Sequence, residues 1–283
     1  MSPIKNSTTF FAYVRRSPFG GRLSQAQVDG INSILAAWDY YGLTDRRWLA
    51  CMFAETFHET GGRMMPVRET FASSDAGARA ALEKAWKAGR LSSVKTPYWR
   101  ENYFGRGLVQ ITHEENYRTL GERLGVDLVA HPEMALDPEI SAKIVVVGMA
   151  EGLFTGKKLE DYFSHKADDP VGSRAIVNGK DKAKLIATYY KAFLDAIEAS
   201  ATAGPTSDAT PEMAKPDDVK PSESGSALSI LTGLGGSAAA SALLGVNNPW
   251  GFGIAALIVL TGAAAGYMLL SGRWTINRGS AVV

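Results

Sequence analysis

Residues 45–62 read DRRWLACMFAETFHETGG, an apolar run followed by a polar cluster and two glycines. The apolar run is typical of a helix that packs into a core, and Gly61 and Gly62 favour a C-terminal stop. The stretch therefore predicts a helix from about Asp45 to Glu59, with a carboxyl group at its C-terminal end.

Further helices are expected on both sides of this stretch. Ser24 can cap a helix in which apolar residues recur at helical spacing from Val28 to Trp38. On the other side, residues 76–90 (AGARAALEKAWKAGR) predict a short solvated helix. These segments make a helical domain the simplest interpretation.

The later part of the domain continues the pattern. A strongly apolar helix is expected after Pro138, although its run at 144–147 is equally typical of a buried strand. A last helix should place Leu185, Tyr189 and Phe193 on one face. Because little in the sequence indicates a large sheet, the predicted fold class is mainly α.

Composition excludes several classes of protein. Apolar residues make up 46%, charged residues 21%, and the formal charge is +1, so nothing global suggests nucleic-acid binding. The single cysteine, Cys51, excludes an internal disulfide framework and a cysteine-rich metal site. The histidines are scattered and no zinc-type His spacing appears, so we expect neither a metal nor a cofactor.

The sequence predicts a boundary near residue 199. Residues 1–199 form the expected helical domain, and 200–224 form a Pro-rich linker that should be extended and mobile, because it cannot bury a core. No signal peptide is expected, since Arg15 and Arg16 lie where an apolar segment would be needed.

The C-terminal region is apolar. No charged residue lies between Glu223 and Arg273, and residues 249–272 are long enough for a transmembrane helix, which needs ~20 apolar residues. The small-residue segment 225–247 is a possible second membrane segment. We therefore expect a membrane-associated protein with the lipid bilayer as a partner, acting on the periplasmic side, its topology open.

Polar residues with catalytic potential gather around the end of the central helix. Glu59 lies at the negative end of the helix dipole and near apolar neighbours, which favours a protonated carboxyl group able to act as a general acid. Glu69 follows beyond the glycine turn, where a returning chain can present a second carboxylate. Two carboxyl groups flanking a sugar bond are the minimal equipment for glycoside hydrolysis.

A second polar cluster occupies residues 103–113, YFGRGLVQITH. If this segment is extended, Gln110 and Thr112 face one side and the intervening apolar residues face the other. The polar side can then bond sugar hydroxyls or an attacking water.

These blocks together resemble glycoside hydrolase family 19, the chitinase-like and phage endolysin-type hydrolases. FHETGG at 57–62 is similar to the family's HESGG signature, and YFGRGLVQITHEENY at 103–117 to its Y-x-GRG block. HPEMALDPEISAKI at 131–144 and Val-Asn-Gly at 177–179 follow in the family's order.

The resemblance implies a lysozyme-like helical fold with a cleft between two lobes. By position, Glu59 matches the general acid, Glu69 the base, and Thr112 a residue that helps hold the attacking water, in an inverting reaction. The residues that match substrate-contacting positions of the family are Gln110, Asn116, Tyr117 and Asn178. We also expect substrate contacts from His58, Tyr103 and Arg106.

Several of these assignments have an alternative. Glu101 is the reserve candidate for the base, because the residues around Glu69 depart from the family's pattern. His58 is also suited to support the Glu59 turn. Arg106 is also suited to pair with a carboxylate, and Glu55 to support the helix end.

The predicted function is that of a peptidoglycan-degrading, muramidase-like endolysin that cuts β-1,4 glycosidic bonds. A chitinase is the alternative, since both polymers contain β-1,4-linked N-acetylated sugars and the motifs do not separate them. A non-catalytic glycan-binding or holin-like membrane lysis protein is the alternative of another class. The scissile bond, the oligomeric state, and a role in phage lysis, genome entry or wall remodelling stay open.

Overall fold

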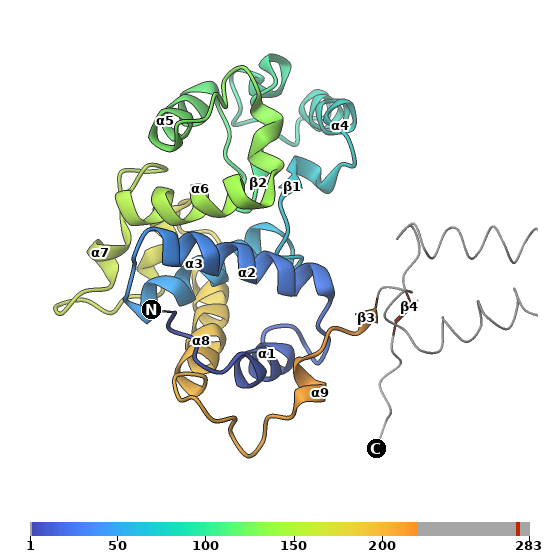
Figure 1. Cartoon of the computed structure of the whole chain (residues 1–283). Coiled ribbons are helices and arrows are strands. Elements are labelled where there is room, and N and C mark those ends of the chain that lie inside the picture. The colour runs from blue at the N-terminus through green and yellow to red at the C-terminus, as the bar shows by residue number, and fades with distance from the viewer. Residues whose placement is uncertain (1, 220–275, 278–283) are drawn as a thin grey trace, which may run out of the picture. The chain divides into compact units, whose positions relative to one another are not determined.

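The computed structural model describes residues 2–219 and 276–277, and the chain divides into two units, Met1–Lys215 and Pro216–Val283. The first unit is predominantly helical (Figure 1), as predicted. Its helices are α1 (Ser7–Arg16), α2 (Gln25–Tyr40), α3 (Arg46–Glu59), α4 (Asp75–Lys87), α5 (Glu114–Leu124), α6 (Pro138–Glu151), α7 (Leu159–Tyr162), α8 (Ala183–Ala199) and α9 (Pro211–Ala214).

Short elements connect these helices. The first unit contains the 3-10 helices η1 (Glu69–Phe71), η2 (Tyr98–Glu101), η3 (Pro132–Leu136) and η4 (Gly172–Ile176), and the strands β1 (Val67–Arg68) and β2 (Arg106–Gly107). β1 and β2 pair antiparallel. In the second unit, β3 (Asp218–Val219) pairs antiparallel with β4 (Ile276–Asn277).

Helix α3 lies at the centre of the first unit because its middle, from Trp48 to Ala54, is an unbroken apolar run. Every residue from Leu49 to Thr56 is buried, and α8 packs along the helix. Its C-terminal end agrees with the prediction, since Gly61 and Gly62 follow with φ of 58° and 79°, a region that glycine adopts without strain.

The hydrophobic interior has two parts. The larger cluster joins α1, α2, α3, α5, α6 and α8, whereas a smaller one consists of Ala78, Leu82, Trp99 and Phe104 between α4 and the chain around η2. In Figure 1, α4 and α5 lie on one side of α6, and α1, α2 and α8 lie on the other. The segments 67–69 and 104–107 run between these parts.

Two predictions about helices change in detail. The run at 144–147 belongs to α6, so the strand alternative is wrong for it. In α8 the buried face contains Ile186, Tyr190 and Phe193, whereas Leu185 is 43% exposed. The predicted face was therefore displaced by one residue at its first two positions, because Leu185 and Ile186 are both apolar and helical spacing alone does not choose between them.

The segment 200–215 corrects the predicted linker boundary, because it packs against α1. The Arg16 guanidinium forms an ion pair of 2.6 Å with Asp208, and Arg15 Nε donates to the carbonyl of Met213 at 2.6 Å. Composition predicted mobility because the segment is too polar to form a core of its own. The arginines of α1 supply the missing partners.

The membrane localisation is also corrected. Within residues 2–219 and 276–277, no helix combines the length and apolar character needed to cross a bilayer. The predicted segments at 225–247 and 249–272, and the linker residues 220–224, lie outside the described residues. We therefore withdraw the assignment to a membrane.

Candidate active site

Glu59 is the last residue of α3, and its side chain is 17% exposed. Arg174 Nη1 lies 2.6 Å from Glu59 Oε1, so the carboxyl group is held at the edge of the core by a guanidinium group. The Gly61–Gly62 turn follows at once and carries the chain away from the helix axis.

Arg174 serves two carboxyl groups. It lies in η4 with a side chain 3% exposed, and the same Nη1 atom also contacts Glu55, which is fully buried one helical turn before Glu59. Burial raises the pKa of Glu55 to about 8, against the opposing effect of Arg174. Glu55 therefore keeps a proton near neutral pH, and it lies beside the ion pair of Arg174 and Glu59.

Glu69 is held by neutral donors. The hydroxyl of Tyr98 donates to Glu69 Oε1 at 2.8 Å, and the backbone N–H of Gly105 donates to Oε2 at 2.7 Å. Burial, reinforced by the Glu69 carboxylate, raises the pKa of Tyr98, so its hydroxyl keeps the proton that it donates. Both Glu69 oxygens thus accept a hydrogen bond, a pattern that suits the ionised form.

The short β1–β2 pair brings Glu69 to this position. Val67 lies opposite Gly107 and Arg68 opposite Arg106, and the Glu69 N–H donates to the Gly105 carbonyl at 2.7 Å. The ladder therefore fixes the backbone of residue 69 against the GRG block, although the two segments lie far apart in the sequence.

Gln110 lies on the same side of this ladder. A Cβ atom on Gly105 would lie 2.9 Å from Gln110 Oε1 and 3.3 Å from Glu69 Oε2, so both side chains occupy the space that a side chain at 105 would need. Gln110 Nε2 donates to the Val67 carbonyl at 2.8 Å. The glycine at 105 is thus required for the close approach of the two polar groups.

Thr112 and Asn116 follow in the same block. Both are half-buried, and Asn116 Nδ2 donates to the Thr112 carbonyl at 2.7 Å from the first turn of α5. The predicted alternation of 103–113 is only partly correct, because β2 is two residues long and the chain turns sharply between Arg106 and Ile111.

Arg106 and Tyr117 correct the prediction of substrate contact, because both side chains are fully buried. Arg106 pairs with Asp75 at 2.7 Å and lies 3.7 Å above the Phe104 ring, and the Tyr117 hydroxyl donates to the Phe104 carbonyl at 2.8 Å. These residues hold the GRG block in place, as the alternative for Arg106 anticipated.

His58 and Asn178 lie around Glu59. Burial lowers the pKa of His58, so its ring is neutral at physiological pH, and it lies 6.5 Å from the Tyr189 ring. Asn178 is exposed, and its backbone N–H donates to the Arg174 carbonyl at 3.0 Å. The Val-Asn-Gly motif therefore sits on the turn that positions the partner of Glu59.

Tyr103 and Glu101 lie around the GRG block. The Tyr103 hydroxyl donates to the Val129 carbonyl at 3.2 Å. Glu101 is exposed and lines a hollow of about 550 Å³ together with Tyr98 and His113, among other residues. Since Tyr98 also bonds Glu69, the reserve base and the predicted base lie on two sides of one tyrosine.

Packing brings the Glu69 segment back to the end of α3. A Cβ atom on Gly61 would lie 3.2 Å from the Phe71 ring, and the Arg63 guanidinium lies 4.3 Å above the same ring. Because Phe71 belongs to η1 with Glu69, the η1 segment returns towards the turn that follows Glu59.

Sequence reasoning missed Arg174 and Tyr98. Arg174 lies 119 residues from Glu55, and Tyr98 lies 29 residues from Glu69. The one available signal for Arg174 was its position shortly before the Val-Asn-Gly motif at 177–179, four residues ahead of Asn178. No spacing rule indicates Tyr98, whose role depends on the contact between η2 and Glu69 of η1.

Comparison with known proteins follows this geometry. Residues 32–150 match the profile of glycoside hydrolase family 19, described as chitinase class I. This part of the chain belongs to family 19. The resemblance drawn from the motifs is therefore confirmed, and the family 19 segment contains every residue of the α3 end, η1 and the GRG block.

The family 19 segment has curated relatives in plants. Chitinase 11 of Oryza sativa subsp. japonica is 35% identical over 104 residues, which are 36% of this chain and 35% of that protein. Endochitinase B of Nicotiana tabacum is 36% identical over 107 residues, 35% of this chain and 31% of that protein. The matched region thus spans about a third of each relative.

A solved structure resembles the chain over a longer stretch. Chitinase C from Streptomyces griseus is 20% identical, with a TM-score of 0.41, and the match covers 65% of this chain and 95% of that one.

Proposed function

We propose that the protein hydrolyses β-1,4 glycosidic bonds in a polymer of N-acetylated amino sugars by an inverting, two-carboxylate mechanism. The observation that carries the proposal is the contrast between the two carboxyl groups. Glu59 belongs to a charge cluster with Arg174 and buried Glu55, whereas Glu69 accepts hydrogen bonds from neutral donors only. Environments that separate two carboxyl groups are what acid and base roles require.

Glu59 acts as the general acid. Burial keeps Glu55 protonated near neutral pH one helical turn before Glu59, and both carboxyl groups contact Arg174. Glu59 is the member of this cluster that reaches the surface, so it is the one that protonates the departing glycosidic oxygen. Arg174 then stabilises the carboxylate that remains.

Glu69 acts as the general base. Tyr98 and Gly105 orient its ionised carboxylate, which removes a proton from water on the face of the sugar opposite the leaving group. Gln110 lies beside it, and Thr112 follows on the same segment, so both are suited to position that water. Attack from the opposite face inverts the anomeric centre, in a lysozyme-like cleft between the two parts of the helical unit.

Chitin is the substrate that the comparisons favour, since the curated relatives are named chitinases. Peptidoglycan, the substrate of the muramidase-like, endolysin-type prediction, shares the β-1,4 linkage and the N-acetyl groups and stays a second candidate. Release of reducing ends from colloidal chitin and loss of turbidity from peptidoglycan sacculi separate the two.

Substitution of the acid tests the mechanism. Glu59→Gln in the full chain should lower kcat by ~10²–10⁴-fold, the usual contribution of a general acid or base. Asp195→Asn, in an exposed ion pair on α8, is the matched control and should keep wild-type activity. A wild-type protein that binds glycan without releasing reducing ends would instead support the non-catalytic glycan-binding alternative.

A further inference from the structure

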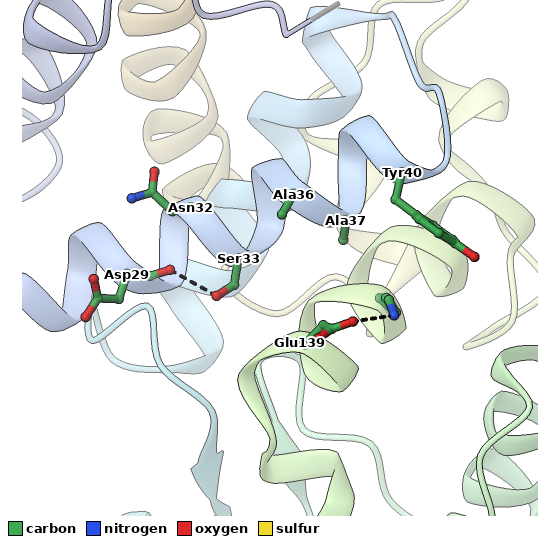
Figure 2. Close-up of a pocket in the computed structure, with 8 residues that line it drawn as sticks. Asp29, Asn32, Ser33, Ala36, Ala37, Tyr40 and Glu139 are labelled. Carbon is green, nitrogen blue, oxygen red and sulfur yellow. Dashed lines mark hydrogen bonds and ion pairs between the residues drawn. The ribbon is translucent and has the colours of Figure 1, made fainter.

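A groove separate from the two carboxyl groups lies between α2 and α6 (Figure 2). Its volume is about 580 Å³, within the range of ~300–1,000 Å³ that is usual for small-ligand sites. Its lining residues are Asp29, Asn32, Ser33, Ala36, Ala37, Tyr40, Glu139 and Lys143.

The floor of the groove is one stripe of α2. Asp29, Ser33, Ala36 and Tyr40 recur at spacings of three and four residues, so they share a face of the helix. In Figure 2, Asp29 and Tyr40 lie at the two ends of this stripe, and Glu139 faces it from α6. Ser33 and Ala36, the two small residues between Asp29 and Tyr40, leave the space of the groove open.

None of the predicted catalytic residues Glu59, Glu69 and Thr112 lines the groove. Gln27 and Gly30 belong to another stripe of α2, and this stripe contacts the chain that follows Glu59. Gln27 Nε2 donates to the Gly62 carbonyl at 2.8 Å, and a Cβ on Gly30 would overlap the Met64 carbonyl. At 3.6 residues per turn, Gln27 lies nearly opposite the groove stripe and Gly30 about a quarter turn from it. Glu59 is not among the residues that line the groove.

Tyr40 provides an exposed aromatic platform. It is 73% exposed, while Tyr41 packs edge-on against it with ring centroids 4.9 Å apart, and the Lys143 ammonium lies 5.3 Å from its centroid. The neighbours fix the ring before any ligand arrives. An apolar ring that stays in water gains free energy when an apolar surface covers it, such as the C–H face of a pyranose.

Polar groups surround this platform. Lys143 pairs with Glu139 at 2.6 Å, and Asp29 accepts from Gln25 at 2.8 Å, so charged and neutral groups able to bond hydroxyls line both walls. Asp29 and Glu139 against Lys143 leave one net negative charge. That charge disfavours anionic ligands and suits a neutral polyhydroxyl chain.

We propose that the α2–α6 groove is a non-catalytic binding site for a neutral chain of β-1,4-linked N-acetylglucosamine. It holds the polymer on one side of the protein while the carboxyl groups act on another stretch. The inference rests on the proposed function for the identity of the ligand, but the groove contributes nothing to the chemical step. A polymer bound at both places is retained longer than a short oligomer, which occupies one place only.

Binding to insoluble chitin by full-length protein tests the inference. In a Glu59→Gln background, which prevents turnover, Tyr40→Ala should weaken chitin binding about tenfold, the loss expected for one aromatic platform. Leu185→Ala, at an apolar residue on α8 that is 43% exposed, is the matched control and should bind as its parent. Unchanged melting temperatures exclude misfolding for both variants.

Activity separates this inference from the proposed function. With Glu59 intact, Tyr40→Ala should hydrolyse short soluble oligomers with an unchanged kcat/KM but degrade chitin more slowly. Equal chitin binding with and without the Tyr40 ring would refute the binding role of the groove, as would equal losses of hydrolysis rate on soluble and insoluble substrates. Either result would leave the proposed function standing. Absence of any hydrolysis by the wild type would refute the proposed function, irrespective of what Tyr40→Ala does to binding.

Discussion

The end of α3 and the β1–β2 pair hold their carboxyl groups by different means. At the end of α3, a nearly buried guanidinium contacts two carboxyl groups. At the β1–β2 pair, a tyrosine hydroxyl and a backbone N–H each donate to one oxygen of a single carboxylate. The proposed acid and base roles rest on this contrast between a charged and a neutral environment.

Removal of the base should give the largest effect. Glu69→Gln is expected to lower kcat by ~10²–10⁴-fold, because no carboxylate remains to activate water. Azide, a small nucleophile that needs no deprotonation, should restore part of the activity of Glu69→Gln but none of that of Glu59→Gln. Rescue of both variants, or of Glu59→Gln alone, would reverse the acid and base assignments.

Loss of the guanidinium should mainly affect stability. Arg174→Ala leaves Glu55 buried without its partner, and we expect it to lower the free energy of unfolding by about 3–5 kcal/mol. Arg123→Ala, which removes an exposed pair with Glu151, should cost about 0–1 kcal/mol. Urea denaturation measures both, and similar losses in the two variants would contradict the special role of the buried cluster.

Removal of the tyrosine hydroxyl should have a moderate effect on catalysis. Tyr98→Phe deprives Glu69 of one of its two donors, and kcat should fall about tenfold, in line with ~1.5 kcal/mol for a hydrogen bond to a charged group. Steady-state kinetics on a soluble oligomer measures the change, and an unchanged kcat in Tyr98→Phe would contradict this role of the hydroxyl.

The last prediction concerns the pH dependence of stability. Burial raises the pKa of Glu55 from 4.5 to about 8, so its contribution to stability is complete below pH 4.5 and is lost as pH rises towards 8. Glu55→Gln cannot titrate, and its melting temperature should fall less than that of the wild type between pH 5 and 8. Parallel curves for the two proteins would contradict this assignment.

Local patterns predicted the parts of the molecule that local chemistry determines. The glycine pair that ends α3, the Ser24 cap of α2 and the apolar course of α6 all follow from neighbouring residues, and the structure contains each of them. Glu59 was located correctly for the same reason. The return of Glu69 was predicted only as a possibility for the chain beyond the turn.

Tertiary contacts account for what the sequence did not predict. Arg174 and Tyr98 act on residues of other elements, so no periodicity identifies them. Arg106 and Tyr117 resembled substrate contacts because they are polar, yet they bond each other in the interior at 3.1 Å. Polarity predicts that a side chain needs a partner, but it does not tell whether that partner is a ligand or the protein itself.

The packing of residues 200–215 on α1 has a practical consequence for dissecting the protein. A fragment that stops at residue 199 would lose Asp208 and the carbonyl of Met213, exposing the arginines of α1 that they engage. A fragment that stops at residue 215 retains both contacts, so it should melt at a higher temperature than the shorter fragment.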